Sequence, residues 1–383
     1  MSARMLAVLV GLLVLIGTGA AWYYRQDNRN TTVELLGKPL LPDLKAAQVA
    51  AIEIRQPEGT LTLARKGENW VITERADFPA DATKVREFLL KLIELKIGQN
   101  EPLAAADRQR LQLADTGKEG AATRLVLKAA DGKLLGTLLI GKKYFKGATP
   151  DNADRVPGDG RFVMLPTAAE RVFIVSDPLA QATAKSSLWV QTDGIAVANP
   201  VMMEMRFHDG ERWRINKLDG NQGWKLDPLK PGEKAEQSKL SGAAYGLYEL
   251  KISDVAVPGL SDADAGLDKA LTLTAESQEG ARYALKLGKP REQDAAIYAR
   301  IAVEKAPEVK PRVPYKDEKP EDKAKFDKEY NERFAKDQNR YAREKALAAW
   351  TVTVPLKSLN EVLKRRADLL EKKDGGKKAG ARK

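Results

Sequence analysis

The sequence predicts an α+β protein in which an N-terminal transmembrane helix is followed by two tandem repeated α+β domains with antiparallel sheets. Three observations lead to this fold class. The segment Met5–Tyr24 carries no charged residue. Short alternating strands are separated by turns, which favours hairpins and antiparallel pairing over parallel βαβ units. The same order of strands, turns and one helix occurs twice after residue 30, and such internal similarity indicates a duplication.

The N-terminal segment has the features of a membrane anchor. Met5–Tyr24 is about as long as the ~20 residues that cross a bilayer as a helix. Trp22–Tyr24 forms an aromatic group of the kind that lies at the lipid–water boundary. The small residues Gly19–Ala21 leave a cleaved signal peptide as the alternative, but the apolar run exceeds the usual h-region of about 7–15 residues. We therefore expect residues 1–30 to be an uncleaved anchor.

The flanking charges leave the orientation of this anchor open. Arg4 and the amino terminus lie on one side, and Arg25 and Arg29 lie on the other, so the positive-inside rule does not decide between them. A signal anchor usually leaves its long C-terminal part outside. For a bacterial protein, we expect a single-pass protein of the inner membrane with a periplasmic or other extracytoplasmic soluble part.

The first repeat, residues 31–190, begins with hairpin patterns. Val49–Arg55 and Leu61–Arg65 predict paired strands, and a strand with a lone tryptophan, Asn69–Ile72, follows them. Asp81 is the expected N-cap of a helix whose apolar residues recur at helical spacing: Val85, Phe88, Leu89, Leu92 and Leu95. The remaining predicted strands are Thr123–Lys128, Leu134–Ile140, Arg161–Leu165 and Arg171–Val175.

The second repeat, residues 191–371, shows the same series, with Trp224 in the place of Trp70. Its helix is expected to start near Lys234 and to contain Leu240, Ala244, Leu247, Tyr248 and Leu250. Apolar spacing predicts a last helix over Pro355–Leu370. The predicted strands are Val201–Phe207, Trp213–Asn216, Gly223–Leu226, Leu271–Glu276, Tyr283–Leu287, Ile297–Ile301 and Trp350–Val354.

A charged insertion interrupts the second repeat at about residues 305–349. It begins as a proline-rich linker and continues as a strongly charged helix. Phe326, Tyr330, Phe334 and Tyr341 are spaced four, four and seven residues apart, which places them on one helix face. This stripe either binds a partner or packs onto its own domain.

The basic charge of the chain is partly concentrated at its C-terminus. Residues 372–383 are expected to be a disordered tail. The whole chain has a formal net charge of +11, so the folded part is less basic than this total suggests. We expect membrane lipid and an envelope protein as partners, and no nucleic acid. The tail sets six basic residues against Asp374 and the terminal carboxylate: Lys372, Lys373, Lys377, Lys378, Arg382 and Lys383.

No pattern in the sequence indicates catalysis, a cofactor or a metal site. There is no cysteine, and the single histidine, His208, lies beside a predicted turn. Gly136–Lys142 has the glycine and lysine spacing of a phosphate-binding loop, but its interior is apolar and Lys143 replaces the required Ser or Thr. Carboxylates near Gly266 lack the ligand order of a calcium loop. We therefore expect no enzyme activity.

The order of these features resembles the domain of unknown function 4340 family. The resemblance is carried by the anchor, Asn69–Ile72, Pro79–Asp81 before the leucine-rich helix, Gly288, and Tyr298–Arg300. The chain departs from the family at Lys234–Glu236, where an alanine–aspartate pair is expected, and in its charged insertion. The resemblance implies a membrane-anchored envelope protein, often associated with gliding-motility-type ABC transporter components. It implies no catalytic residues.

These observations lead to one main functional expectation. We expect a membrane-anchored extracytoplasmic accessory or scaffold protein that binds an envelope partner, such as an ABC-type transporter. The alternative is a hydrolase or binder of envelope glycans or lipids that uses a cleft between the two repeats.

Overall fold

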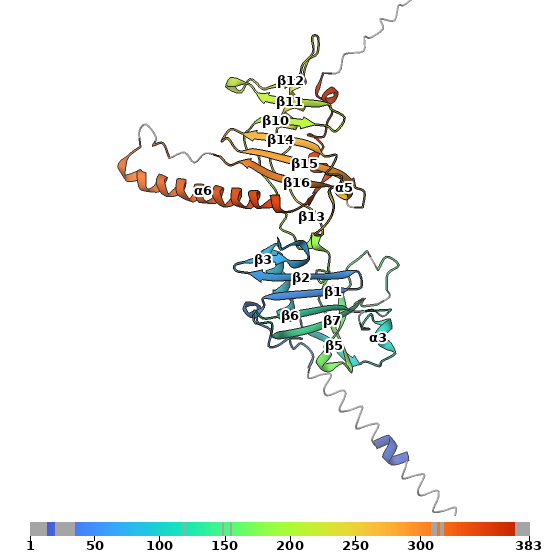
Figure 1. Ribbon diagram of the computed structural model, residues 1–383. Coiled ribbons are helices and arrows are strands. Elements are labelled where there is room, and N and C mark those ends of the chain that lie inside the picture. Colours follow the sequence, from blue (N-terminus) through green and yellow to red (C-terminus); the bar gives the residue numbers. More distant parts are fainter. Residues whose placement is uncertain are drawn as a thin grey trace, which may run out of the picture. The chain divides into compact units, whose positions relative to one another are not determined.

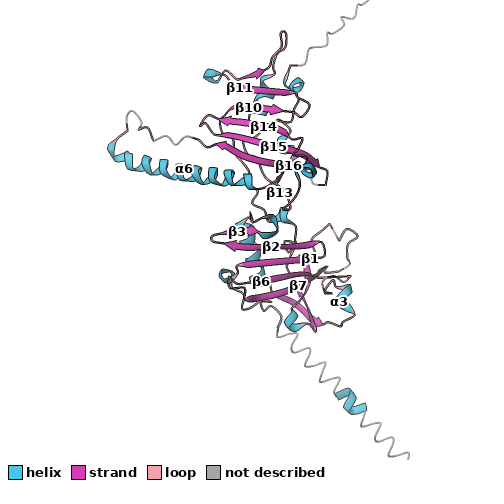
Figure 2. Cartoon of the chain, viewed as in Figure 1, coloured by secondary structure: helices cyan, strands magenta, loops and turns pink. Residues whose placement is uncertain are grey.

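The computed structural model of the protein describes residues 14–19 and 35–371, except residues 116, 118, 148, 154, 294, 308–311 and 315–317. The chain divides after Trp189 into two compact units. Each unit is built on an antiparallel sheet with few helices, as Figures 1 and 2 show. The predicted α+β class with antiparallel sheets is therefore confirmed.

Most of the predicted membrane anchor, residues 1–30, lies outside the described residues, as does the basic tail 372–383. Residues 14–19 are described and are helical. In the part of the chain that the structure describes, no helix combines the length and the apolar character needed to span a membrane. The anchor stays a prediction.

The described residues of the first unit form one sheet with the strand order β4-β3-β2-β1-β6-β7-β8-β9-β5. Every neighbouring pair is antiparallel. The helices are α2 (Ala82–Glu94) and α3 (Asp107–Arg110). The strands are β1 (Ala51–Gln56), β2 (Gly59–Lys66), β3 (Asn69–Ile72), β4 (Phe78–Pro79), β5 (Ile97–Pro102), β6 (Thr123–Lys128), β7 (Leu134–Tyr144), β8 (Gly160–Met164) and β9 (Arg171–Val175).

Helix α2 begins where the sequence predicts it. The Asp81 carboxylate accepts hydrogen bonds from the amides of Thr83 and Lys84, at 3.0 and 3.3 Å, and so caps the first turn. One face of the helix is buried, and Phe88 on this face meets the ring of Trp189 edge-on at 5.4 Å. This capped, one-sided helix covers the apolar core of the first unit.

The described part of the second unit has the sheet order β12-β11-β10-β14-β15-β16-β17-β13. If β4 is left out and the strands of each unit are numbered along the chain, the two sheets have the same strand order, so they share one topology. Its helices are α4 (Gln237–Ala244), α5 (Asp262–Ala265) and α6 (Pro320–Ala346). Its strands are β10 (Pro200–Arg206), β11 (Arg212–Lys217), β12 (Trp224–Asp227), β13 (Asp254–Val255), β14 (Leu271–Ser277), β15 (Arg282–Arg291), β16 (Ala296–Lys305) and β17 (Val352–Pro355).

Two glycines occupy matching places in the repeats. A Cβ on Gly141 would lie 2.4 Å from the carbonyl oxygen of Leu111, and a Cβ on Gly288 would lie 2.1 Å from that of Ala265. Both glycines sit inside long strands, β7 and β15, against the segments that contain α3 and α5. Neither glycine therefore ends its strand. A glycine is needed because a backbone segment crosses the strand too closely for any side chain.

The predicted last helix, Pro355–Leu370, is also wrong. The segment forms two short 3₁₀ turns, Leu356–Leu359 and Arg366–Leu369, joined by irregular chain. The backbone of this segment forms hydrogen bonds with other parts of the second unit in place of helical ones. For example, the indole N–H of Trp213 donates to the carbonyl of Lys364 at 2.8 Å. These contacts outweigh the apolar spacing that favoured a helix.

The helix of the second repeat is shorter than predicted. Helix α4 ends at Ala244, although Leu247 and Leu250 are buried beyond it. A Cβ on Gly246 would lie 2.5 Å from Val362, so the chain turns where a closely packed neighbour leaves room only for glycine. At its start, Glu236 provides no side-chain cap, unlike Asp81 in the first repeat.

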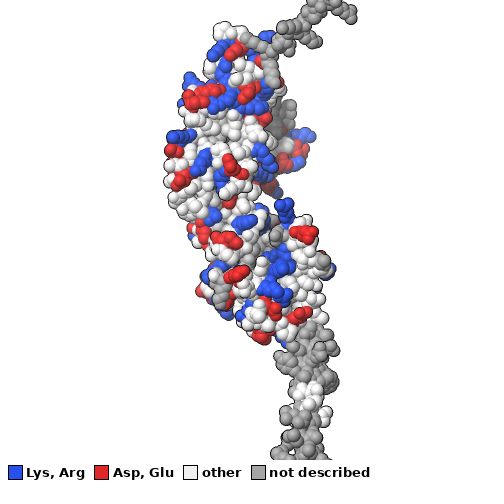
Figure 3. All heavy atoms as spheres, turned by 90° about the vertical axis from the view of Figure 1, so that its right-hand side faces the viewer, with Lys and Arg blue, Asp and Glu red and all other residues white. Residues whose placement is uncertain are grey.

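Charged side chains are mixed over the visible surface. Figure 3 shows one face on which Lys and Arg alternate with Asp and Glu in both units, with a run of basic side chains on the first unit. On this face the basic side chains therefore do not form a single patch that covers either unit.

Candidate functional site

The charged insertion forms helix α6, as predicted. Its 27 residues make it about 40 Å long, at the usual rise of ~1.5 Å per residue. Figure 1 shows that α6 reaches sideways from the second sheet and that its C-terminal end lies beside β16. The structure describes all of α6, and within it only Tyr341 and Glu344 are buried. Most of this helix therefore stands clear of its own core.

The structure brings together three of the four predicted aromatic residues. Tyr330, Phe334 and Tyr341 line one groove, whereas Phe326 lies outside its lining. The rings of Tyr330 and Phe334 are nearly parallel, with an interplanar angle of 8° and centroids 6.3 Å apart. Tyr330, Phe334 and Phe326 are partly exposed, and Tyr341 is 9% exposed. The stripe thus packs on its own domain at one end and remains accessible along the rest.

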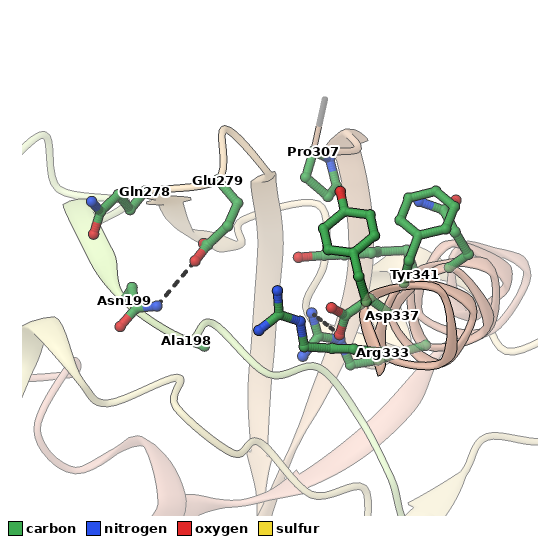
Figure 4. Close-up of a pocket in the computed structure, with 12 residues that line it drawn as sticks. Ala198, Asn199, Gln278, Glu279, Pro307, Arg333, Asp337 and Tyr341 are labelled. Carbon is green, nitrogen blue, oxygen red and sulfur yellow. Dashed lines mark hydrogen bonds and ion pairs between the residues drawn. The ribbon is translucent and has the colours of Figure 1, made fainter. Parts of the chain in front are cut away.

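The groove has a volume of about 600 Å³. Helix α6 forms one wall. The other wall comes from Ala198 and Asn199, just before β10, and from Gln278 and Glu279 in the turn between β14 and β15. Figure 4 shows these residues on the other side of the opening from the helix, with the Glu279 carboxylate directed toward Asn199 and Pro307 at one margin. The site therefore joins three segments that are far apart in the sequence.

Polar groups on the far wall are held by local contacts. The Asn199 amide donates to the Glu279 carboxylate at 3.0 Å. Burial acts to raise the pKa of Glu279, but the hydrogen bonds from Asn199, from its own amide and from Ser277 outweigh it, so the pKa is lowered. Asn199 has a left-handed backbone with φ of 47°. Asparagine adopts this region more readily than most other non-glycine residues.

Arginines on the helix wall lie against the aromatic rings. The guanidinium of Arg340 is 4.6 Å from the centre of the Tyr341 ring and 3.4 Å from the Asp337 carboxylate. The guanidinium of Arg333 is 5.7 Å from the centre of the Tyr330 ring. These cation–π contacts hold cationic groups beside the apolar surface of the groove.

Glu344 anchors the C-terminal end of the helix. Its carboxyl group is fully buried and accepts hydrogen bonds from the Ala196 amide and the Tyr283 hydroxyl, both at 3.0 Å. Burial raises the pKa of Glu344, and these hydrogen bonds oppose the shift only in part. Burial also raises the pKa of Tyr283, so its hydroxyl keeps the proton that it donates. The helix wall is thereby fixed to β15 and to the segment before β10.

The sequence does not predict the far wall of the groove or the buried contacts of Glu344. Tyr283 begins the predicted strand Tyr283–Leu287, but nothing in the sequence marks a buried partner for its hydroxyl. Glu344 lies among many charged residues of one helix, so only the tertiary structure separates it from its exposed neighbours. Asn199 and Glu279 flank strands whose pairing across the sheet could not be read from local patterns.

The groove is suited to binding. Its polar groups include a carboxylate, Glu279, whose pKa is shifted in the direction opposite to that of a typical general acid. Among the residues that the structure describes, no group of three or more His, Asp or Glu side chains could hold a metal ion. His208 lies in the turn after β10 and is exposed. What the site offers is an aromatic surface with hydrogen-bonding groups along both sides.

Comparisons with known proteins support the family resemblance. The family described as "Domain of unknown function (DUF4340)" matches residues 70–270, more than half of the 383 residues. The match begins within the tryptophan strand of the first repeat, covers α2 and ends just before β14 in the second repeat. No curated protein and no solved structure matches the chain. The chain belongs to the DUF4340 family.

Proposed function

We propose that this protein is a membrane-anchored extracytoplasmic accessory protein that binds an envelope protein through the groove beside α6. The observation that carries the proposal is the aromatic face of α6, where Tyr330 and Phe334 are accessible over a groove of about 600 Å³. A long helix that is polar on most of its surface gains little stability from its own domain alone. A bound partner would provide the missing contacts.

The internal repeat offers a comparison for this site. In the first repeat, β8 and β9 are joined by residues 165–170, which form one short 3₁₀ turn. The matching strands of the second repeat, β16 and β17, are joined by residues 306–351, which contain α6. The duplicated sheet therefore does not need the helix in order to form. The insertion adds a surface to the second sheet that the first sheet lacks at the matching connection.

The lining has the composition of a protein-binding surface. Tyrosine, phenylalanine and arginine are enriched at the centres of protein interfaces, where a few such residues supply most of the binding energy. Tyr330, Phe334 and Arg333 present these groups along one helix face. The uncharged Met5–Tyr24 segment favours a location at the membrane, and the family resemblance favours an ABC-type transporter component as the partner.

Co-purification from gently solubilised membranes tests the proposal. The tagged full-length protein is expected to bring down a partner, and the double variant Tyr330→Ala/Phe334→Ala is expected to lose it. The matched control is Lys328→Ala/Glu332→Ala, which removes an exposed ion pair of 3.9 Å on the same helix. Repeated recovery of the wild type alone, or a partner that is retained by the aromatic variant, would refute the proposal.

The location of the soluble part needs a separate test. Protease added to spheroplasts is expected to digest residues 35–371 while the same protein in intact cells is protected. Protection in spheroplasts, with digestion only after lysis, would place the soluble part in the cytoplasm and exclude an extracytoplasmic role.

A further inference from the structure

The two halves of α6 carry opposite charge. Residues 320–332 contain five acidic and three basic side chains: Glu321, Asp322, Asp327, Glu329 and Glu332 against Lys323, Lys325 and Lys328. Residues 333–346 contain five basic and two acidic side chains: Arg333, Lys336, Arg340, Arg343 and Lys345 against Asp337 and Glu344. Because Glu344 is fully buried, the accessible surface of the second half is more basic than this count. The groove lies along this basic half.

The acidic group on the helix wall of the groove is already paired, because Asp337 lies 3.4 Å from Arg340. Glu279 on the far wall keeps its negative charge, since its hydrogen bond from the Asn199 amide and the charge of Arg340 help to lower its pKa. By contrast, Arg333 in the groove lining is exposed, as is Lys336, which lies three residues further along α6 and outside the lining; neither makes an ion pair within the described part of the chain. The charge left for a ligand at the helix side of the groove is therefore positive.

We propose that the groove takes an acidic, amphipathic polypeptide segment of the partner. Apolar side chains of this segment pack on Tyr330 and Phe334, and its carboxylates pair with Arg333 and Lys336. Arg333 is suited to this role because a guanidinium binds a carboxylate through two parallel hydrogen bonds. Its position over the Tyr330 ring places these donors next to the apolar surface. The inference rests on the proposed function and adds the chemistry of the partner.

Two synthetic peptides are suitable probes. Each has about 15 residues and carries Leu and Phe along one helical face. The opposite face carries Glu in the first peptide and Lys in the second. Fluorescence anisotropy is expected to show that the wild-type protein binds the Glu peptide and not the Lys peptide. Raising the salt from about 50 to about 300 mM is expected to weaken binding, because exposed charge pairs are screened.

A charge-reversal variant with a matched control sharpens the test. Arg333→Glu/Lys336→Glu is expected to weaken binding of the Glu peptide by about tenfold or more and to create binding of the Lys peptide. Lys323→Glu/Lys325→Glu changes the net charge by the same amount on the acidic half of the same helix. It is expected to leave the preference unchanged. Circular dichroism of both variants confirms that they fold.

The outcomes separate this inference from the proposed function. Equal binding of the two peptides, binding of neither, or an equal effect of the two charge reversals overturns the acidic-segment inference. The proposed function then still stands if Tyr330→Ala/Phe334→Ala loses the membrane partner. If that aromatic variant keeps the partner, the proposed function fails whatever the peptides show.

Discussion

The buried carboxyl group of Glu344 accepts a hydrogen bond from the hydroxyl of Tyr283 at 3.0 Å, which joins α6 to β15. The same carboxyl group accepts from the amide of Ala196, in the segment that leads into β10. The helix wall of the groove and its far wall are therefore attached to a common point. Changes at Glu344 should alter both the stability of the second unit and the position of α6.

Replacing Glu344 with alanine should destabilise the protein. The change leaves the Tyr283 hydroxyl and the Ala196 amide buried without their acceptor, which costs about 2–3 kcal/mol in the free energy of unfolding. Urea unfolding of the full chain measures this loss. The control Glu332→Ala removes an exposed carboxylate from the same helix and should change the free energy by less than about 0.5 kcal/mol. Equal effects of the two changes would show that Glu344 is not an anchor.

The contribution of Glu344 should depend on pH. Burial raises its pKa in the folded protein above the ordinary value of 4.5, so the folded state binds the proton more tightly than the unfolded state. The stabilisation is then complete below pH 4.5 and is lost as the pH rises through the folded pKa.

Comparison with Glu344→Gln, which cannot titrate at this position, isolates this effect. The wild type should lose stability relative to the variant as the pH is raised from about 4.5 to about 8. The unfolding free energy of the wild type minus that of the variant should therefore fall over this range. A difference that is constant or grows over this range would contradict the raised pKa.

The sequence predicts those parts of the fold that depend on local patterns. The tryptophan strand Asn69–Ile72 and the strand Thr123–Lys128 have the predicted bounds, because a run of three apolar residues marks each. Asp81 is identifiable as a cap because its residue type and position suffice for the role. Strand β5 escapes prediction, since Ile97–Pro102 contains a glycine, a proline and polar residues and owes its conformation to pairing with β9.

The candidate site is predictable only on its helical side. The spacing of Tyr330, Phe334 and Tyr341 is enough to place them on one face of α6. The opposite wall depends on which hairpin turn the sheet order brings next to the helix. The duplication is visible in the sequence, but the insertion has no counterpart in the first repeat from which its contacts could be inferred.

The two matched glycines offer a test of the structural repeat. Gly141→Ala and Gly288→Ala should each destabilise the protein, because the added methyl group would lie 2.4 Å and 2.1 Å from a backbone carbonyl oxygen. Forcing such a group into a packed interior costs about 1–3 kcal/mol. Thermal unfolding measures the loss, and Gly136→Ala is the control because its nearest neighbours lie 3.8 Å or more away. If Gly141→Ala or Gly288→Ala proves as harmless as the control, the close backbone crossing is disproved.

A half-buried arginine in the first unit should reduce stability. Arg161 is the second residue of β8 and lies opposite Lys143 on β7, so two cationic residues face each other across the strands. Burial lowers the pKa of Arg161, and its Nε atom is buried without a hydrogen-bond partner in the part of the chain that the structure describes. An unpaired charge that has lost its water is costly, whereas the aliphatic stem of the side chain packs favourably.

Arg161→Met keeps this stem and removes the charge, so it should raise the free energy of unfolding by about 1 kcal/mol. Urea unfolding at neutral pH measures the change. Arg86→Met, at an exposed position on α2, loses the same charge without relieving any burial and should have almost no effect. A fall in stability for Arg161→Met would show that the guanidinium makes a favourable interaction that outweighs the loss of its hydration. An equal gain in both variants would assign the effect to net charge, because Arg86 and Arg161 share their charge and differ in burial.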